Sequence, residues 1–466
     1  MIVSGKKVLV VGVARSGLAA ARLLASRGAV VMANDMKAEN DLLTSSLAAE
    51  IEELRKGGVT FVFGSHPQEV FENADLIILS PGVPLTIEPL QKAQAAGVEI
   101  ISEPELAGRF LRGRMIGITG SNGKTTTTTL IGELMRAAGA DVIIGGNIGT
   151  ALTGLVEQSH DNSWTVAELS SFQLETIESL RVHVAVVTNI TPDHLDRHGT
   201  FENYVRAKQQ IFRNQTREDF AILNRGSQAV VDMVEEYGHS SRPVYFSSNA
   251  GSDAKNDIYL RDSRILTALL NSNETEVLGI DEIQVPGMHN VENIMAALAA
   301  VFCAMQTKPD AVEPLRQVIR NFKGVEHRIE FVAEINGVKF YNDSKATNVD
   351  STVKSLEAFK QNVIIILGGK DKGSDYTILA PLIRERVKQI VLIGAASDKI
   401  AAQLEGTRPM VRATSMQDAV EKSFAAASAG DTVLLAPACA SFDMFDNYEQ
   451  RGRIYKESVK SVALSS

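Results

Sequence analysis

Short runs of apolar residues alternate along the whole chain with longer stretches in which apolar residues recur every three or four positions. The runs are rich in valine and isoleucine, which favour β-strands, and the longer stretches have the spacing of amphipathic helices. Continuous apolar strands that alternate with helices are typical of parallel sheets covered on both faces. We therefore predict an α/β protein throughout. The predicted strands include residues 7–12, 74–80, 114–120, 183–189, 362–369, 389–394 and 431–437.

The chain has 466 residues, which exceeds the usual size of one domain, about 100–200 residues. We expect three domains, each long enough to bury its own core. The stretch at residues 250–285 is polar and alternating, and it predicts an antiparallel extension of the second domain's sheet. The predicted domains are residues 1–102, 103–323 and 324–466.

The composition is that of a globular protein in water, with 44% hydrophobic and 22% charged residues. The net charge is −9 and no run is rich in lysine or arginine, which disfavours nucleic acid as a partner. No stretch is expected to be apolar and long enough to cross a bilayer, and Cys303 and Cys439 are too few for a disulfide framework. We therefore expect a cytoplasmic monomer without membrane insertion.

A segment rich in glycine and threonine, GITGSNGKTTTTTL at residues 117–130, follows one predicted strand and opens a predicted helix. Threonine is a mediocre helix former, so five threonines at a helix start need another explanation. A loop between a strand and a helix presents backbone N–H groups to an anion, and the helix dipole adds to the attraction. We predict that Lys124 contacts nucleotide phosphates, that the Thr125 hydroxyl binds Mg²⁺, and that Thr126 lies near a phosphate. Hydroxyls that bond local backbone groups would account for the other threonines.

The segment departs from the common pattern G-x-x-x-x-G-K-[ST], because Ile118 stands where the pattern has glycine. The alternative is a glycine-rich turn that caps an ordinary helix. We favour phosphate binding because the strand, the Lys–Thr pair and the helix occur in the required order.

The first domain has its own glycine-containing loop, GVARSG, after its first predicted strand. The loop differs from the dinucleotide-binding pattern G-x-G-x-x-G by Ala14, at the position where a pyrophosphate needs close approach to the backbone. Asp35 stands at the tip of the second strand, where that fold contacts a ribose. From these residues alone, NAD binding stays open.

The loop GSNGKTT, together with eight further motifs, resembles the Mur ligases of bacterial cell-wall synthesis, which are ATP-dependent amino-acid ligases related to folylpolyglutamate synthases. The motifs NDSKATN and APACASFDMFDNYEQRG are most similar to the branch that adds D-glutamate. The DNPR-type motif of the branch that adds diaminopimelate or lysine is absent from the sequence. The eight motifs lie at residues 145–152, 167–175, 189–208, 287–298, 326–331, 342–348, 367–373 and 436–452.

The resemblance implies a Rossmann-like N-terminal domain, a central P-loop ATPase-like domain with a mostly parallel sheet, and a Rossmann-like C-terminal domain. It implies an ATP-dependent ligase that adds D-glutamate to UDP-N-acetylmuramoyl-L-alanine in peptidoglycan precursor synthesis, with release of ADP and phosphate. The substrate carboxylate would first be activated as an acyl phosphate, because carboxylate oxygen is a poor leaving group. The expected cofactors are ATP and Mg²⁺.

The resemblance also assigns catalytic and metal-binding residues. Glu168 ends a predicted strand, at the edge where α/β sheets bind ligands, and a surface glutamate is the alternative. Periodicity indicates a solvated helix lysine at Lys208, but its position matches the lysine that these ligases carry as a carbamate formed with CO₂. Asp193 is expected to cap a helix, and Asp196 and His198 stay unassigned. The implied Mg²⁺ ligands are Thr125, Glu168, His194 and carbamylated Lys208, and the implied catalytic residues are Lys124, Glu168, His194, Lys208 and Lys345.

Further contacts follow from the resemblance. For Asn290 and Asn293 the alternative is N-capping, and for Asn147 it is a turn beside glycines. Lys370 and Asp371 receive no role. The implied ATP contacts are Gly120, Ser121, Asn122, Gly123, Lys124, Thr125, Thr126, Asn290, Asn293, Arg328 and Asp343. The implied contacts to the UDP-substrate are Ser16, Gly17, Leu18, Asp35, Ser80, Gly82 and Asn147, and those to D-glutamate are Lys345, Thr347, Lys372, Ser441 and Tyr448.

Three alternative functions stay open at this point. A folylpolyglutamate synthase-like ligase would share the ATP site but lacks a domain equivalent to residues 1–102. An NAD-dependent oxidoreductase would rest on the first domain alone and would leave the GSNGKTT loop unexplained. A non-enzymatic P-loop regulator predicts ATP turnover that does not depend on an amino acid.

Overall fold

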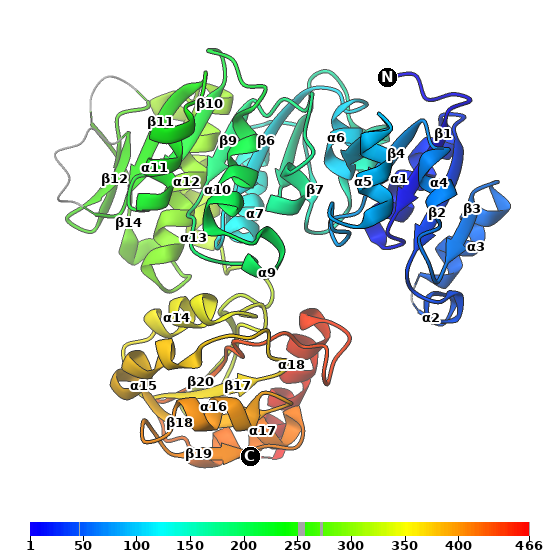
Figure 1. The fold of residues 1–466 in the computed structure, drawn as a ribbon. Coiled ribbons are helices and arrows are strands. Elements are labelled where there is room, and N and C mark those ends of the chain that lie inside the picture. The colour runs from blue at the N-terminus through cyan, green and yellow to red at the C-terminus, as the bar shows by residue number, and fades with distance from the viewer. Residues whose placement is uncertain (46, 250–256, 271–273, 466) are drawn as a thin grey trace. The chain divides into compact units, whose positions relative to one another are not determined.

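The computed structural model describes residues 1–45, 47–249, 257–270 and 274–465. Within these residues the chain forms two compact units (Figure 1). The first unit comprises Met1–Leu278 and Glu292–Val318, and the second comprises Gly279–Val291 and Ile319–Ser466. The first unit contains two of the described sheets, and the second unit contains the third.

The N-terminal sheet has five described strands, all parallel, in the order β3-β2-β1-β4-β5. In the central strand β1, Val8 and Val10 belong to one hydrophobic core, and Leu9 and Val11 belong to another. The prediction of a parallel sheet covered on both faces is confirmed here. The strand order reverses between β1 and β4, whose carboxyl ends form the edge where such sheets bind ligands. The elements are β1 (Lys7–Val11), α1 (Arg15–Ser26), β2 (Val30–Asp35), α2 (Glu39–Leu43), α3 (Ala48–Lys56), β3 (Thr60–Phe63), α4 (Gln68–Glu72), β4 (Leu76–Leu79), α5 (Glu88–Ala95), β5 (Glu99–Ser102) and α6 (Glu103–Gly108).

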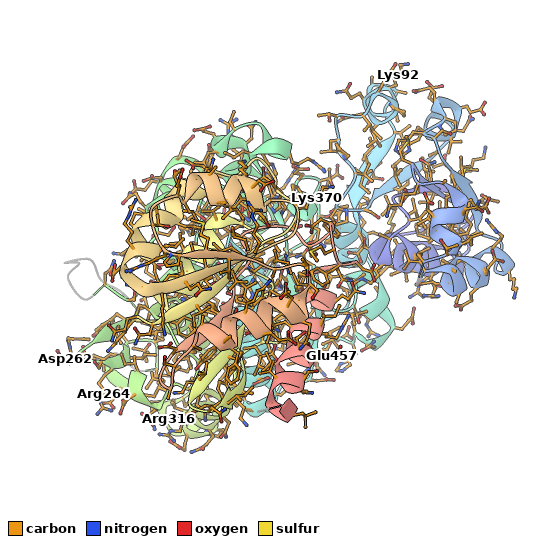
Figure 2. The ribbon with its side chains drawn as sticks, turned by 90° about the horizontal axis from the view of Figure 1, so that it is seen from below. Lys92, Asp262, Arg264, Arg316, Lys370 and Glu457 are labelled. Carbon is orange, nitrogen blue, oxygen red and sulfur yellow. The ribbon has the colours of Figure 1, made fainter. Side chains whose placement is uncertain are left out.

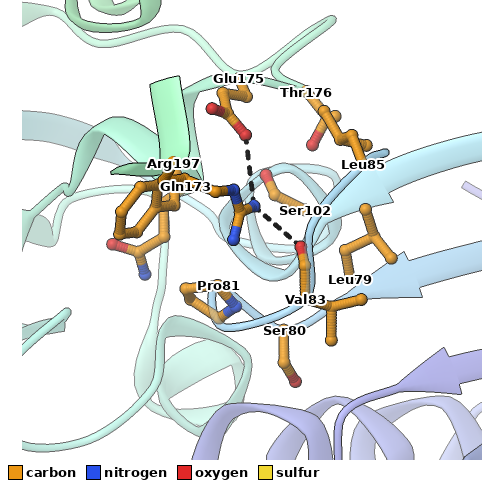
Figure 3. A pocket seen from close by; sticks show the side chains of 11 residues that line it. Leu79, Ser80, Pro81, Val83, Leu85, Ser102, Gln173, Glu175, Thr176 and Arg197 are labelled. Carbon is orange, nitrogen blue, oxygen red and sulfur yellow. Dashed lines mark hydrogen bonds and ion pairs between the residues drawn. The ribbon is translucent and has the colours of Figure 1, made fainter. Parts of the chain in front are cut away.

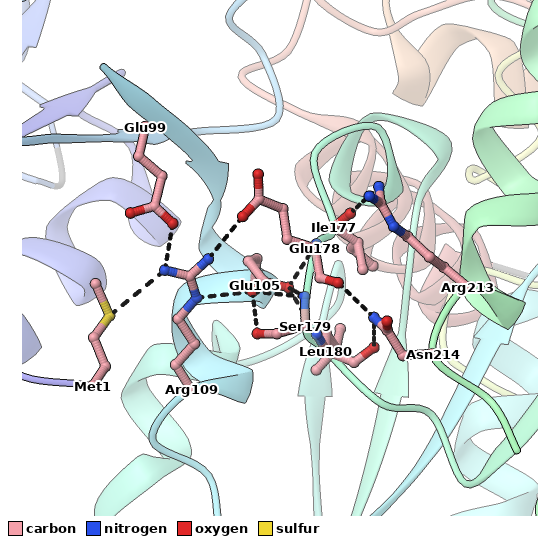
Figure 4. Close-up of polar contacts among 10 residues, drawn as sticks. All are labelled: Met1, Glu99, Glu105, Arg109, Ile177, Glu178, Ser179, Leu180, Arg213 and Asn214. Atoms are coloured by element: carbon pink, nitrogen blue, oxygen red, sulfur yellow. Dashed lines mark hydrogen bonds and ion pairs between the residues drawn. The ribbon is translucent and has the colours of Figure 1, made fainter. Parts of the chain in front are cut away.

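Helix α6 joins the N-terminal sheet to the larger sheet of the same unit. Its Leu106 belongs to the N-terminal core, whereas Ala107 belongs to the core of the larger sheet. The buried carboxylate of Glu105 accepts the backbone amides of Glu178 and Leu180, at 3.0 and 2.9 Å (Figure 4). The helix therefore attaches one core to the other both by packing and by hydrogen bonds.

Two carboxyl groups of α6 have pKa values shifted in opposite directions. Burial alone would raise the pKa of Glu105, but hydrogen bonds from Ser179, Arg109 and backbone amides outweigh it and hold the pKa below its usual value. Burial raises the pKa of Glu103 to about 7, although Thr153 donates two hydrogen bonds to it. Ionised Glu105 therefore stabilises the fold above the ordinary carboxyl pKa, and this contribution is lost as pH falls. The contribution of Glu103 to the stability of the fold has the opposite pH dependence. It is present at acidic pH, where the carboxyl is protonated, and is lost as pH rises towards 7.

We expect Glu105→Gln to lower the free energy of unfolding by roughly 2–4 kcal/mol at neutral pH, because buried donors lose a charged acceptor. The loss should shrink in acid, where the wild-type carboxyl is protonated as well. Glu103→Gln is the matched control, and it should remove the decline in stability that Glu103 causes between about pH 4.5 and 7. Urea unfolding followed by the fluorescence of Trp164, the chain's single tryptophan, measures both effects. Equal losses of stability in the two variants at neutral pH would contradict these assignments.

The larger sheet of the first unit has nine described strands in the order β14-β13-β12-β11-β10-β9-β6-β8-β7. Neighbouring strands from β7 through β11 pair in parallel. β12 and β13 pair antiparallel, as predicted for residues 250–285, of which residues 250–256 and 271–273 lie outside the described part. The elements here are β6 (Arg114–Thr119), α7 (Lys124–Ala137), β7 (Val142–Gly146), β8 (Trp164–Glu168), α8 (Ser171–Leu174), β9 (Val184–Val187), α9 (Leu195–His198), α10 (Phe201–Gln209), β10 (Phe220–Asn224), α11 (Gln228–Tyr237), β11 (Arg242–Ser247), β12 (Ile258–Arg261), β13 (Arg264–Thr267), β14 (Thr275–Gly279), α12 (Met288–Met305) and α13 (Glu313–Asn321).

Helix α12 corrects the expectation that no stretch of the chain is apolar and long enough to cross a bilayer. Its mean hydropathy is 1.3 over 18 residues, so by length and composition it could cross a membrane. However, 72% of the helix is buried inside the protein, and Ile294, Leu298 and Val301 have no exposed surface. A helix that is apolar on nearly all sides is expected when the fold buries it, so α12 is a core helix.

The second unit contains a sheet of six described strands in the order β15-β16-β20-β17-β18-β19. β15 and β16 form an antiparallel hairpin, and the other neighbours pair in parallel. The hairpin turns at Asn336 and Gly337, whose φ angles of 49° and 77° are typical of a type I′ turn. Ile364 and Ile365 of β17 lie in different cores, so this sheet too is covered on both faces. The elements are β15 (Glu330–Ile335), β16 (Val338–Asn342), α14 (Val349–Glu357), β17 (Val363–Gly368), α15 (Ala380–Arg386), β18 (Val387–Ile393), α16 (Ser397–Gln403), β19 (Met410–Arg412), α17 (Met416–Ala426), β20 (Thr432–Leu435) and α18 (Tyr448–Ser465).

Candidate active site

The loop between β6 and α7, which the sequence predicts to bind phosphate and which is therefore named the phosphate loop, has the backbone conformation of an anion-binding loop. Gly120 and Gly123 have φ angles of 145° and 82°. A Cβ at Gly120 would lie 2.0 Å from Thr188 Oγ1. A Cβ at Gly123 would lie 2.2 Å from Asn293 Oδ1. Glycine is therefore required at both positions, and the loop leads directly into the N-terminus of α7, where backbone N–H groups attract anions. Ile118, which departs from the common pattern, is a buried residue of strand β6 and not part of the loop.

Lys124 is the first residue of α7 and turns back over this loop. Its Nζ donates to the carbonyl oxygens of Gly120 and Ser121, at 2.9 Å each. The ammonium group therefore lies on the loop itself, where it adds positive charge to the N-terminus of the helix.

The threonines of α7 have different hydrogen-bond partners. Thr125 Oγ1 donates to Glu168 Oε2 at 2.8 Å. Thr127 Oγ1 donates to Asn293 Oδ1 at 3.3 Å, and Thr129 Oγ1 donates to the Thr125 carbonyl at 2.9 Å. The predicted bonding of threonine hydroxyls to local backbone is confirmed for Thr129, whereas Thr127 reaches a side chain of α12.

Glu168 ends β8 and connects the phosphate loop to the loop that follows β7. Its Oε2 accepts the Thr125 hydroxyl, and its Oε1 accepts the side-chain amide of Asn147 at 2.9 Å. The alternative of a surface glutamate is wrong, because Glu168 is only 1% exposed. A carboxylate and a hydroxyl in contact are oxygen donors of the kind that Mg²⁺ prefers, so the residues present fit this ion.

Lys208 of α10 lies beside the same loop and is also only 1% exposed. Its Nζ donates to the Gly120 carbonyl at 2.8 Å and lies 4.5 Å from the ring centroid of Tyr204. Burial lowers the pKa of Lys208 well below its usual value, and the charge of Lys124 lowers it further, although nearby carboxylates oppose the shift. The interpretation of Lys208 as a solvated lysine, which helix periodicity favoured, is therefore wrong.

The DHLDRH segment at residues 193–198 contains the single turn α9 (Leu195–His198). Its N-cap is His194, which has a left-handed φ of 54°, and Asp193 accepts the backbone amide of His194 at 2.9 Å. The expectation that Asp193 caps the helix is corrected, because the left-handed residue separates Asp193 from the first turn. His198 is buried and contacts the Ser171 hydroxyl at 2.9 Å, so its ring belongs to the packing of the segment. The side chain of Asp196 lies outside the described part.

Asn293, on α12, lies next to the phosphate loop. Its Oδ1 accepts the Thr127 hydroxyl and is the atom that a Cβ at Gly123 would meet. Asn290 precedes Asn293 by three residues, and its Nδ2 donates to the Pro286 carbonyl at 2.7 Å. The structure therefore gives Asn290 a local backbone contact at the helix start and gives Asn293 a contact with α7.

The predicted substrate residues of the N-terminal sheet meet at the carboxyl ends of β1, β2 and β4. Ser80 Oγ donates to the Gly12 carbonyl at 2.8 Å, and a Cβ at Gly17 would lie 2.0 Å from the same oxygen. Asp35 accepts the backbone amide of Val13 at 2.7 Å. These contacts hold the first glycine loop against the strand ends, at the switch point where ligands bind.

Two residues of this group can offer only their backbone to a ligand. Leu18 has no exposed surface and packs in the N-terminal core, so its side chain is not available. Gly82 has no side chain to offer. Ser16 is half-buried in the first turn of α1.

The predicted nucleotide residues of the second unit lie around the end of β16. Asp343 is buried, and burial raises its pKa to about 6 although a neighbouring hydroxyl and Arg328 oppose the shift. Nε of Arg328 is buried and has no hydrogen-bond partner among the described residues, which fits a site that binds an acceptor group. Lys345 Nζ lies 5.5 Å from the ring centroid of Tyr448, and the Lys345 carbonyl accepts the amide of Thr347 at 2.8 Å.

Two further loops of this unit carry the remaining residues predicted to contact D-glutamate. A backbone bridge between Lys370 and Ala440 holds the loop of Lys372 beside the loop of Ser441. Lys372 is exposed, whereas Ser441 is buried. Asp371, which had no role from the sequence, accepts a backbone amide and a tyrosine hydroxyl within this loop.

Arg451 was missed by the sequence reasoning. It is 1% exposed, and its guanidinium donates to Oγ and to the carbonyl of Ser344, at 2.9 and 2.7 Å, and to the Cys439 carbonyl at 3.1 Å. It therefore joins the NDSKATN segment to the APACASFD segment. The sequence did contain a signal that Arg451 is buried. Arg451, Tyr455 and Val459 follow one another at four-residue spacing on one face of α18, and the latter two are apolar and buried.

Comparisons with known proteins cover almost the whole chain. Residues 6–102 match the model of the Mur ligase MurD-like N-terminal domain, residues 118–301 the Mur ligase middle domain, and residues 327–439 the Mur ligase glutamate ligase domain. The chain is 46% identical over 463 residues to the UDP-N-acetylmuramoylalanine--D-glutamate ligase of Koribacter versatilis, covering 99% of each chain. It is 48% identical over 460 residues to the ligase of the same name from Acidobacterium capsulatum, covering 98% of this chain and 97% of the relative.

A solved structure shows the same fold. The UDP-N-acetylmuramate-alanine ligase from Thermotoga maritima aligns with a TM-score of 0.59 at 18% identity, over 98% of this chain and 100% of that chain. The predicted three-domain α/β fold with mostly parallel sheets is confirmed. The alternatives of an NAD-dependent oxidoreductase and of a non-enzymatic regulator are wrong, because Mur ligases are enzymes that generally use ATP and Mg²⁺. The chain belongs to the Mur ligase family.

Proposed function

We propose that this protein joins D-glutamate to UDP-N-acetylmuramoyl-L-alanine, with release of ADP and phosphate, in peptidoglycan precursor synthesis. Two relatives, 46% and 48% identical over almost their full length, carry the name of that activity. The observation that carries the proposal is the arrangement around Gly120, where Lys124, Thr125 with Glu168, and Lys208 meet at one loop.

The proposed chemistry begins with phosphoryl transfer from ATP to the alanine carboxylate of the UDP-substrate. The oxygen of the carboxylate bonds to the γ-phosphorus and ADP leaves, which converts a poor leaving group into phosphate. The amino group of D-glutamate then attacks the acyl carbon, phosphate departs, and the amine loses a proton. The loop amides and Lys124 would stabilise the negative charge that develops on the phosphoryl oxygens.

Mg²⁺ would be held by the Thr125 hydroxyl and the Glu168 carboxylate, with His194 and modified Lys208 as further ligands, and it would neutralise phosphate charge. Asn147, bonded to Glu168, would orient that carboxylate and contact the substrate beside it.

We propose that Lys208 carries a carbamate. The amine of a lysine attacks CO₂ only when it is neutral, and burial together with Lys124 favours the neutral form of Lys208. In the reaction a bond forms between Nζ and the carbon of CO₂, and Nζ loses a proton. The product is an anionic oxygen pair, which suits Mg²⁺ far better than an ammonium group does.

The second unit is proposed to supply the remaining contacts. Asn290, Arg328 and Asp343 would bind ATP together with Asn293, which belongs to the first unit, and Lys345, Thr347, Lys372, Ser441 and Tyr448 would bind D-glutamate, whose two carboxylates suit lysine and hydroxyl partners. We propose domain boundaries at residues 102/103 and 323/324 and a monomer located in the cytoplasm.

The test is phosphate release by the purified full chain with Mg-ATP, UDP-N-acetylmuramoyl-L-alanine and a panel of amino acids. We expect release to require both the UDP-substrate and D-glutamate, and L-glutamate to give little or none. Activity with folate substrates, or no response to D-glutamate, would contradict the proposal.

A further inference from the structure

Arg197, on the single turn α9, contacts both parts of the first unit. Its guanidinium donates to the Val83 carbonyl at 2.8 Å, in the SPGVP loop that follows β4 of the N-terminal sheet. The same group lies 3.6 Å from Glu175 Oε2, and Figure 3 shows it between Glu175 and Val83, with Ser80 lining the same pocket. One side chain therefore connects the proposed substrate loop to the segment that begins with His194.

Phe172 of α8 is the centre of the cluster that holds this segment. The guanidinium of Arg197 lies 4.8 Å from the centroid of the Phe172 ring. His198 stacks on the same ring, with centroids 5.2 Å apart and planes at 14°, and His194 meets it edge-on at 5.0 Å. His198 Nδ1 also lies 3.2 Å from Glu175 Oε1. Phe172 and Glu175 therefore contact the same turn through several side chains.

The conformation of His194 needs such support. Its φ of 54° is unusual for a residue with a side chain, and such residues persist where the surrounding structure determines them. The turn that follows has only four residues, too few for its own hydrogen bonds to hold it. The contacts of Arg197 and His198 with α8 supply the missing constraint.

We propose that Arg197 is a positioning residue, which holds the segment of His194 and the substrate loop at residues 80–84 in one fixed arrangement. This inference rests on the proposed function, in which His194 is a Mg²⁺ ligand and Ser80 contacts the UDP-substrate. Arginine suits the role because its planar guanidinium can stack on an aromatic ring while its edge donates to a carbonyl and a carboxylate. Lysine would retain the charge but not the planar stacking or the set of donors in fixed directions.

The test compares Arg197→Met, which keeps an apolar chain of similar length, with the conservative Arg197→Lys. Arg112→Met is the matched control, because Arg112 is an exposed arginine of the same unit that pairs with Asp161 at 2.7 Å. Binding of Mn²⁺ to the full chain with a non-hydrolysable ATP analogue is measured by electron paramagnetic resonance, and KM is measured for each substrate. We expect Arg197→Met to weaken Mn²⁺ binding and to raise KM for the UDP-substrate by about tenfold each, with KM for ATP unchanged. Arg197→Lys should lie between wild type and Arg197→Met, and Arg112→Met should match wild type.

A merely structural role of Arg197 predicts a different result, namely a lower kcat from a smaller active fraction with Mn²⁺ binding and KM unchanged. That result, or wild-type behaviour of Arg197→Met, would overturn the proposal. If Arg197→Met does not fold, Mn²⁺ binding and KM for the UDP-substrate are measured on Arg197→Lys instead, and weaker binding with a raised KM supports the proposal. The proposed function fails separately, if wild type shows no phosphate release that depends on D-glutamate. In that case the binding of Mn²⁺ and of the UDP-substrate to wild type and variants still decides the role of Arg197.

Discussion

Replacing Lys124 with alanine is expected to lower kcat/KM by about 10³-fold or more. The Lys124 ammonium lies on the phosphate loop, 2.9 Å from two of its carbonyl oxygens, at the N-terminus of α7. Without it, the loop would lose a positive charge that stabilises the charge on the transferred phosphoryl group. The measurement is D-glutamate-dependent phosphate release over a range of Mg-ATP concentrations.

Lys92→Ala is the control for this experiment. Lys92 is an exposed residue of α5 that pairs with Glu88 at 2.7 Å, and Figure 2 shows it at the periphery of the ribbon. We expect it to retain wild-type activity. Thermal unfolding of Lys124→Ala must be measured in parallel, because loss of two hydrogen bonds to the loop could also loosen the fold. A folded Lys124→Ala variant that keeps more than about a tenth of wild-type activity would contradict the role of Lys124 in phosphate stabilisation.

Replacing Lys208 with alanine is expected to reduce turnover by about 10²-fold or more, with partial recovery on addition of acetate or formate. The buried side chain contacts the Gly120 carbonyl, so its removal leaves a space next to the phosphate loop. A small carboxylate in that space would provide the oxygen pair that the proposed carbamate provides in the wild type. The measurement is phosphate release as a function of carboxylate concentration.

Lys124→Ala is the matched control for the rescue, since it removes a lysine at the same loop that is not proposed to be modified. We expect no recovery of that variant with acetate. A second measurement does not depend on activity: wild type equilibrated with ¹³C-labelled CO₂ should show a carbamate carbon signal that Lys208→Ala lacks. The absence of both the signal and the rescue would show that Lys208 acts as an unmodified amine.

Much of the fold could be predicted from the sequence, because strands and helices follow local patterns. The seven predicted strands correspond to β1, β4, β6, β9, β17, β18 and β20. The hairpin of β15 and β16 was not predicted, although its Asn336–Gly337 pair is a strong local signal for a two-residue turn. The apolar character of helix α12 was not recognised from the sequence. It is explained by the burial of the helix in the fold.

The site was predictable to a lesser degree. The loop at Gly120 and Gly123 and the carboxylate of Glu168 follow from short motifs at strand ends, and the structure brings them together. The positions of Asp193 and Arg451 were not foreseen. Asp193 precedes His194, whose left-handed φ of 54° is unusual for a residue with a side chain. Arg451 donates hydrogen bonds to Ser344, more than a hundred residues before it in the chain, and to Cys439, about a dozen residues before it.

The sequence by itself determined what depends on neighbouring residues: the order of strands and helices, the glycines that a tight loop requires, and the family to which the motifs point. Only the tertiary structure decided which charged side chains are removed from water. Lys208 is the clearest example, because helix periodicity places it on a polar position while a carbonyl 88 residues away and the packing around it bury its amine. Burial depends on segments that are distant along the chain, and it changes the protonation and the chemistry of such a group far more than its neighbours in sequence do.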